Sequence, residues 1–225
     1  MKRTFEPSSR PTRDRILDAA ERLFAENGFA DTSLRRITQE AGANLAAVNY
    51  YFQSKDILIQ EVFARRLGPL NEKRLEMLDA CEREAGGGPP RLQGVLRAFV
   101  DPPIRMGLSD PDVGASAGRL FGRMYLQPGG LFGQIFETQF GRIKQRFMAA
   151  MRRALPEVPE TEMLWRIHFM IGSLGHTMAG REHLKFLSDG RCDATDADAL
   201  ITRLVTFLDA GLRAPVARQQ GGTAC

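Results

Sequence analysis

The stretch that decides the fold runs from Ile16 to Lys55 and reads ILDAAERLFAENGFADTSLRRITQEAGANLAAVNYYFQSK. Its first part carries apolar residues at the spacing of one helical stripe, and Gly28 can end that helix in a left-handed turn. A second helix is expected to follow and to stop at Gly42. After a tight turn, Asn44 can cap a third, very short helix. The stretch therefore predicts three helices in close succession.

Helix, turn and short capped helix is the arrangement of the helix-turn-helix, whose second helix enters the major groove of DNA. The short third helix suits that role because small Ala46 and Ala47 allow close approach to base edges. Asn49 can form a bidentate pair with adenine, and Tyr50 can donate to a phosphate. Val48, Tyr51 and Phe52 are expected to face the core. The residues predicted to contact DNA are Thr32, Ser33, Arg35, Asn44, Leu45, Ala46, Ala47, Asn49, Tyr50 and Lys55.

Basic residues stand at two predicted helix starts. Arg35 and Arg36 lie in the first turn of the second helix, and Lys55 directly follows Ser54, which can cap a fourth. Cations are disfavoured at helix N-termini, but they become favourable when a phosphate completes the site. A flexible basic arm that tracks phosphates, or equally a solubilising tail, is predicted from Lys2, Arg3, Arg10, Arg13 and Arg15.

The rest of the chain also has helical periodicity. We expect an interruption at Gly68-Pro69 and a break or kink at Pro102-Pro103. The predicted fold is all-α, with an N-terminal three-helix DNA-binding domain (1–53), a helical-bundle ligand-binding and dimerisation domain (54–213) and a disordered tail (214–225). The later helices are expected at 54–67, 70–84, 92–108, 115–126, 131–155, 161–187 and 196–212.

Composition argues against several classes of protein. The chain has 225 residues, a net charge of +4 and three scattered cysteines, so neither a disulfide framework nor a structural metal site is expected. His176 and His183 are two helical turns apart, but polar residues on a partly wet helix are favoured over a metal pair. No apolar run approaches the roughly 20 residues that span a bilayer. Because the N-terminus lacks an apolar signal core, secretion is not expected, and the scattered cysteines favour a reducing cytoplasm. We expect neither a membrane segment nor a cofactor.

Large flexible apolar side chains are frequent in the predicted body. They can line an adaptable apolar cavity, although most such residues simply fill a core. Arg119 could pair with a carboxylate or thioester head group; an exposed basic face with Arg123 is the alternative. For His168 the alternative to a ligand contact is a buried, satisfied side chain. The residues predicted to bind a ligand are Met106, Arg119, Phe121, Met124, Phe136, Phe140, Trp165, His168 and Phe169.

Segments 16–29, 32–37, 41–42 and 44–55 resemble the TetR family of repressors. The resemblance implies a homodimer that binds an operator in double-stranded DNA. It also implies that the last two long helices form the dimer interface, here with small residues at 172–179 and an apolar stripe at Ile201, Leu204, Val205 and Leu208. The chain departs from the family at Leu45, where Lys is frequent, and at Asn49, where Tyr is usual. These departures favour base readout by Asn49.

Segments 44–50 and 165–170 also resemble the PsrA-type branch of that family, which implies a long-chain fatty acid or acyl-CoA effector. The leading hypothesis is thus a repressor of palindromic operators that is released by an apolar effector. The same class with another hydrophobic effector, such as a drug or phenolic, is the nearest alternative. An acyl carrier or enzyme with a vestigial head is the alternative from a different class. No catalytic signature of paired carboxylates, a Ser/His/Asp set or a phosphate loop supports it.

Overall fold

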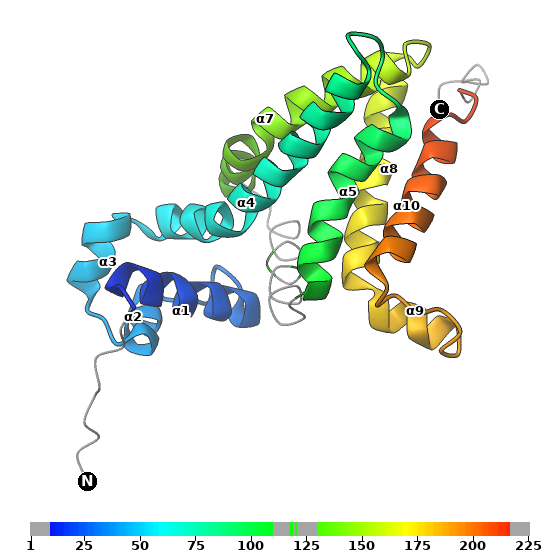
Figure 1. Cartoon of the computed structure of the whole chain (residues 1–225). Helices are drawn as coiled ribbons and strands as arrows, with labels where there is room; N and C mark the ends of the chain where they lie inside the picture. The colour runs from blue at the N-terminus through cyan, green and yellow to red at the C-terminus, as the bar shows by residue number, and fades with distance from the viewer. Residues whose placement is uncertain (1–9, 110–117, 119, 121–129, 217–225) are drawn as a thin grey trace, which may run out of the picture. The chain divides into compact units, whose positions relative to one another are not determined.

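The computed structural model describes residues 10–109, 118, 120 and 130–216, and the regular structure of these residues is helical (Figure 1). The prediction of an all-α fold is confirmed. The predicted helix at 115–126 falls mostly outside the described residues. The helices are α1 (Thr12–Asn27), α2 (Leu34–Ala41), α3 (Leu45–Phe52), α4 (Lys55–Glu84), α5 (Leu92–Ser109), α7 (Gly130–Ala154), α8 (Glu160–Ala179), α9 (Arg181–Leu187) and α10 (Ala197–Leu212).

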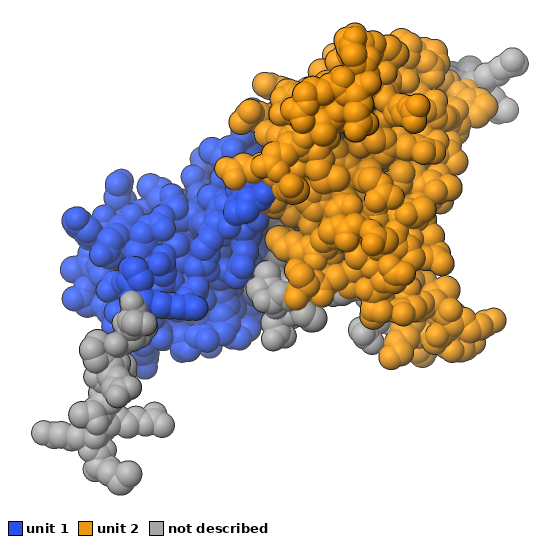
Figure 2. All heavy atoms as spheres, in the orientation of Figure 1, with its two compact units in different colours: residues 1–69, 115–141 blue, residues 70–114, 142–225 orange. Residues whose placement is uncertain are grey.

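The chain divides into two compact units (Figure 2). The first, called the head, holds residues 1–69 and 115–141; the second, called the body, holds residues 70–114 and 142–225. Helix α4 contributes to both units, so the division falls inside it at Pro69 rather than at the predicted start of the body. The predicted tail is ordered at its first residue, because the Ala214 carbonyl accepts a hydrogen bond from Arg166 at 2.9 Å.

The predicted interruption at Gly68-Pro69 is wrong, since α4 continues through it as one helix of 30 residues. A proline inside a helix removes one backbone hydrogen bond and costs about 3 kcal/mol. Leu67 and Leu70, on either side of the break in the pattern, are both buried. Burial of apolar side chains on both sides offsets the local penalty.

Of the break or kink predicted at Pro102-Pro103, the break is wrong, since α5 runs through both prolines. Pro103 has no N–H to donate to the carbonyl four residues earlier, which is that of Phe99. The Arg74 side chain from α4 fills this place, because its Nε donates to the Phe99 oxygen at 2.9 Å. A side chain distant in sequence thus satisfies the carbonyl that the proline leaves unpaired.

In the body, α5, α8 and α10 pack side by side around an apolar core (Figure 1). The stripe of α10 predicted for the dimer interface, from Ile201 to Leu208, is buried in this core instead. That part of the interface prediction is wrong because an amphipathic helix buries its apolar face within its own subunit when α5 and α8 are available. The exposed face of α10 carries Phe207.

The predicted helix at 161–187 is divided at Gly180 into α8 and α9. A Cβ atom at this glycine would lie 2.7 Å from the backbone oxygen of His176. Only glycine fits this close approach without a shift of the backbone, so the residue explains where α8 ends.

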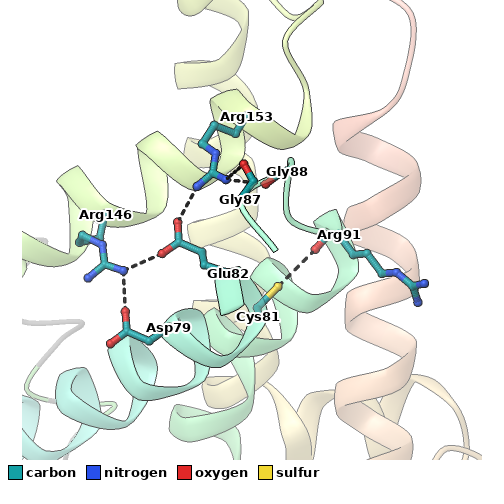
Figure 3. A network of polar contacts seen from close by, with 8 residues as sticks. All are labelled: Asp79, Cys81, Glu82, Gly87, Gly88, Arg91, Arg146 and Arg153. Carbon is teal, nitrogen blue, oxygen red and sulfur yellow. Dashed lines mark hydrogen bonds and ion pairs between the residues drawn. The ribbon is translucent and has the colours of Figure 1, made fainter. Parts of the chain in front are cut away.

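A polar network joins α4 to α7 within the body (Figure 3). Arg146 donates to Asp79 at 2.6 Å and to Glu82 at 2.8 Å, while Arg153 donates to Glu82 at 3.2 Å and to the Gly88 carbonyl. The hydrogen bond to Asp79, outweighing partial burial, raises the pKa of Arg146. Because one carboxylate receives both arginines, the network fixes the register of the two helices.

Candidate nucleic-acid interface

Side-chain caps define the two helices of the helix-turn-helix. Ser33 Oγ accepts from the Arg36 backbone N–H at 3.2 Å at the start of α2, and Asn44 Oδ1 accepts from the Ala47 N–H at 2.8 Å at the start of α3. Gly42, between the helices, has a left-handed backbone with φ of 58°. The turn therefore uses the residue types that its backbone geometry demands.

Helix α3 presents one face to the core and the opposite face to solvent. Val48 and Phe52 are fully buried, whereas Asn49 and Tyr50 are exposed. The prediction that Tyr51 faces the core is wrong, because its side chain is 41% exposed and packs edge-on against Tyr50. The solvent face, which we call the recognition face, consists of Leu45, Ala46, Asn49, Tyr50 and the half-buried Ala47.

Three cations beside this face have no carboxylate partner among the described residues. Arg35 and Arg36 are exposed in the first turn of α2, and the nearest polar contact of Lys55 Nζ is the Ala30 carbonyl at 3.3 Å. By contrast, Arg13 and Arg22 of α1 form ion pairs with Glu61 and Glu40. The unpaired cations lie at the N-termini of α2 and α4, where helix dipoles also favour an anion.

Thr32 does not belong to the exposed set. Its side chain is fully buried, and its hydroxyl lies within hydrogen-bond distance of the carbonyls of Gly28 (2.7 Å) and Leu23 (3.2 Å). The prediction that Thr32 contacts DNA is corrected, because this hydroxyl holds the turn between α1 and α2. Ser33 remains exposed beside it.

A partly buried ion cluster, not predicted from sequence, joins α1 to α4 within the head. Glu21 is buried and accepts from Arg65 at 2.5 Å and from Arg66 at 2.7 Å, while Asp18 accepts from Arg65 at 2.7 Å. Burial lowers the pKa of Arg65, but its hydrogen bonds to Glu21 and Asp18 outweigh that effect and raise it. A glutamate on the apolar stripe of α1 was the available signal for this cluster.

We expect Glu21→Gln to destabilise the head by about 2 kcal/mol, because it leaves Arg65 and Arg66 without their shared carboxylate. Native-state hydrogen exchange of the α1 amides measures the loss. Glu40→Gln is the matched control; it removes an exposed pair with Arg22 and should cost less than about 1 kcal/mol. Equal protection of α1 in both variants would contradict the assigned role of Glu21.

The residues predicted to bind a ligand fall into separate groups. Phe136 and Phe140 pack together on α7 with ring centres 5.5 Å apart, and Met106 is half-buried on α5. Arg119, Phe121 and Met124 lie outside the described residues. The ligand-binding role of the whole set stays a prediction. A small hollow between α5, α8 and α10, lined by Gly107, Thr177 and Leu200 among others, has a volume of about 10 Å³, which is at most enough for one water molecule.

Trp165, His168 and Phe169 gather on the exposed face of α8. Trp165 and Phe169 are 60% and 61% exposed and stack with ring centres 6.0 Å apart, and His168 packs against both rings. The buried alternative for His168 is therefore wrong. Leu164 beside them and Phe207 on α10, 68% exposed, add to the apolar surface. We call these five residues the aromatic face.

The described part of the chain lacks the features of two other kinds of site. None of its helices is long and apolar enough to cross a membrane. Among the same residues, no group of three or more potential metal ligands lies together. The imidazole rings of His176 and His183 pack edge-on against each other, with ring centres 6.2 Å apart.

Two family descriptions match the chain. Residues 16–62 match "Bacterial regulatory proteins, tetR family", and residues 97–211 match "Tetracyclin repressor-like, C-terminal domain". Among curated relatives, the regulator AcrR of Shigella flexneri is 34% identical over 76 residues, 34% of this chain and 35% of AcrR. UidR of Escherichia coli (strain K12) is 36% identical over 58 residues, 26% of this chain and 30% of UidR. These matches span about a third of the relatives' length.

Solved structures resemble the chain over most of its length. The regulator FadR from Bacillus subtilis, solved in complex with stearoyl-CoA, has a TM-score of 0.63 and 15% identity, covering 88% of this chain and 98% of its own. FadR from Bacillus halodurans, a fatty acid degradation regulator, has a TM-score of 0.61 and 16% identity, covering 93% and 100%. At such identities the likeness shows the fold alone.

Proposed function

Because this chain belongs to the TetR family of bacterial transcriptional regulators, we propose that it is a repressor that binds a palindromic operator as a homodimer and is released by an apolar effector. The observation that carries the DNA-binding part is the recognition face of α3, flanked by the unpaired cations Arg35, Arg36 and Lys55. Apolar and amide groups read bases, and cations at helix N-termini hold phosphates.

Within this proposal, Asn49 specifies sequence and Lys55 positions the protein on DNA. Asn49 is exposed on α3 and offers an amide for bidentate pairing with adenine. Ala46 and Ala47 place only methyl groups beside it, which permits close approach and suits thymine methyls. Lys55 stands at the start of α4, where it contributes charge without reading a base.

We expect Asn49→Ala to relax sequence preference by about 1–3 kcal/mol of discrimination, since a bidentate pair is lost. Lys55→Ala should instead weaken binding to all sequences and flatten the salt dependence. Competition binding between the operator and single-base variants, repeated at several salt concentrations, separates the two effects. The same uniform loss in both variants would show that Asn49 does not read a base.

The dimer is proposed to form through the aromatic face of α8 and α10. Apolar side chains that are more than half exposed on two adjacent helices are typical of a surface covered by a partner. Gly172 and Gly175 continue the exposed side of α8, and a Cβ at either would meet nothing within 4 Å, so a second helix can approach closely. Two-fold symmetry then requires paired half-sites about one helical turn apart, which footprinting would detect.

The effector is proposed to be a long-chain acyl compound, and release is proposed to occur by population shift. The hollow between α5, α8 and α10 is too small for a ligand of this size, so such a ligand would stabilise a more open state. Helix α4 contributes to both head and body, and the cluster at Glu21 joins it to α1. A displacement of α4 would thereby move α1 and change the spacing of the two recognition helices. The acyl complex of FadR supports the choice of effector by analogy.

Two alternatives lead to different outcomes. A repressor with another hydrophobic effector would keep operator binding but would not respond to acyl compounds. An acyl carrier or enzyme would not bind promoter DNA and would turn over a thioester. Mass spectrometry of small molecules that co-purify with the protein would identify the effector class directly.

A further inference from the structure

Arg74 on α4 is the most deeply buried cation of the described chain. The residue is only 4% exposed, and its guanidinium lies over the Phe99 ring at 4.2 Å from the ring centre. Nε donates to the Phe99 carbonyl at 2.9 Å, and Nη1 donates to Asn71 Oδ1 at 3.3 Å. No carboxylate among the described residues lies within ion-pair distance of it.

The helix geometry explains only one of these contacts. The Phe99 carbonyl needs a donor because Pro103 has no N–H, and any neutral donor would serve there. The need for a donor at this carbonyl does not explain why the core holds a full charge. Burying a charge costs several kcal/mol when no anion compensates it. Burial lowers the pKa of Arg74 to about 9, so the side chain still carries its charge near neutral pH. A guanidinium has five N–H donors, and the two contacts above use two of them.

We propose that Arg74 binds the carboxylate of the effector, with the ligand's chain lying against the aromatic rings of Phe99 and Phe147. These rings are in edge-on contact with centres 5.2 Å apart, and Phe99 also contacts the guanidinium, so charge and apolar surface adjoin. An arginine fork matches a carboxylate through two parallel hydrogen bonds. The inference rests on the proposed function, because it assigns a head group to the effector of the same body.

The burial of Arg74 selects among acyl compounds. A free carboxylic acid carries its charge on a compact group at the end of its chain, which a deeply buried guanidinium can reach. A coenzyme A thioester is uncharged at its acyl end, and its charges lie on bulky phosphates. The site therefore favours the free acid over the thioester. This distinction separates the chain from the solved FadR complex, whose ligand is stearoyl-CoA.

Calorimetric titration of the full-length protein with dodecanoate, dodecan-1-ol and dodecanoyl-CoA tests the inference. Wild type should bind dodecanoate about 10- to 100-fold more tightly than dodecan-1-ol, the range expected for charge-assisted hydrogen bonds. Arg74→Gln should remove this preference while leaving the affinity for dodecan-1-ol unchanged, and Arg74→Lys should keep part of it. Dodecanoyl-CoA should bind no more tightly than dodecan-1-ol.

A second variant guards against misfolding of Arg74→Gln. Pro103→Ala restores an N–H that can donate to the Phe99 carbonyl, so the double variant Arg74→Gln/Pro103→Ala does not need the arginine for that contact. Loss of the carboxylate preference in this folded double variant supports the inference. The inference is overturned if the double variant keeps the preference for dodecanoate, or if wild type shows no such preference. Tighter binding of dodecanoyl-CoA than of dodecanoate would overturn the choice of the free acid.

Operator binding by the ligand-free protein is measured in parallel. If none of the three compounds binds wild type, the inference fails even when the operator is bound. If the operator is not bound, the repressor proposal fails, whatever the head-group preference of the body.

Discussion

Phe169→Glu and Phe207→Glu should each convert the protein to a monomer and lower operator affinity about 100-fold or more. Both side chains belong to the aromatic face and are more than 60% exposed in the single chain. A glutamate at either position would place an unpaired carboxylate in the proposed interface, which costs several kcal/mol. Each subunit presents one recognition face, so a monomer contacts one half-site and loses the contribution of the other.

Sedimentation velocity with operator titration measures both consequences. Phe186→Glu is the control, because Phe186 is an aromatic residue on α9 that is even more exposed, at 79%, and lies outside the aromatic face. This variant should remain dimeric and bind the operator normally. If Phe169→Glu and Phe207→Glu both form dimers that bind the operator with wild-type affinity, the dimer interface lies elsewhere.

Acyl compounds should lower operator affinity with a strong dependence on chain length. Each methylene that leaves water contributes about 0.8 kcal/mol, which is about fourfold in affinity, until the cavity is full. Across a series from octanoate to octadecanoate the affinity should therefore rise by orders of magnitude and then level off or fall. The hollow between α5, α8 and α10 is too small for such a chain, so the limiting length would report how far the body can open.

Fluorescence anisotropy of a labelled operator, read against concentration for each acid, measures this response. Ligand concentrations must stay below micelle formation, so that release of the operator reflects binding to the protein. Responses that do not vary with chain length would exclude the acyl effector and leave the DNA-binding proposal standing.

The helix-turn-helix could be predicted from sequence because its signals are local. Asn44 caps α3 as predicted, Ser33 caps α2, and Gly42 has the left-handed backbone expected of a helix stop. Val48 is buried and Asn49 is exposed because α3 packs against the core with one face only. The 3.6-residue period of a helix determines which positions lie on that face. The recognition face therefore followed from spacing and residue type.

Contacts between residues distant in sequence decided the features of the fold that the local signals did not predict. Pro69 and Pro103 are sequence signals for helix breaks, yet packing around α4 and the donation from Arg74 keep both helices continuous. An apolar stripe shows that a helix buries one face, but not whether its own subunit or a partner covers it, which is why the stripe of α10 was misassigned. Likewise, the burial of Glu21 and Arg74 depends on neighbouring helices. Sequence alone determined the local helices and the exposed face of α3; tertiary packing decided which charges are buried and which apolar faces remain open.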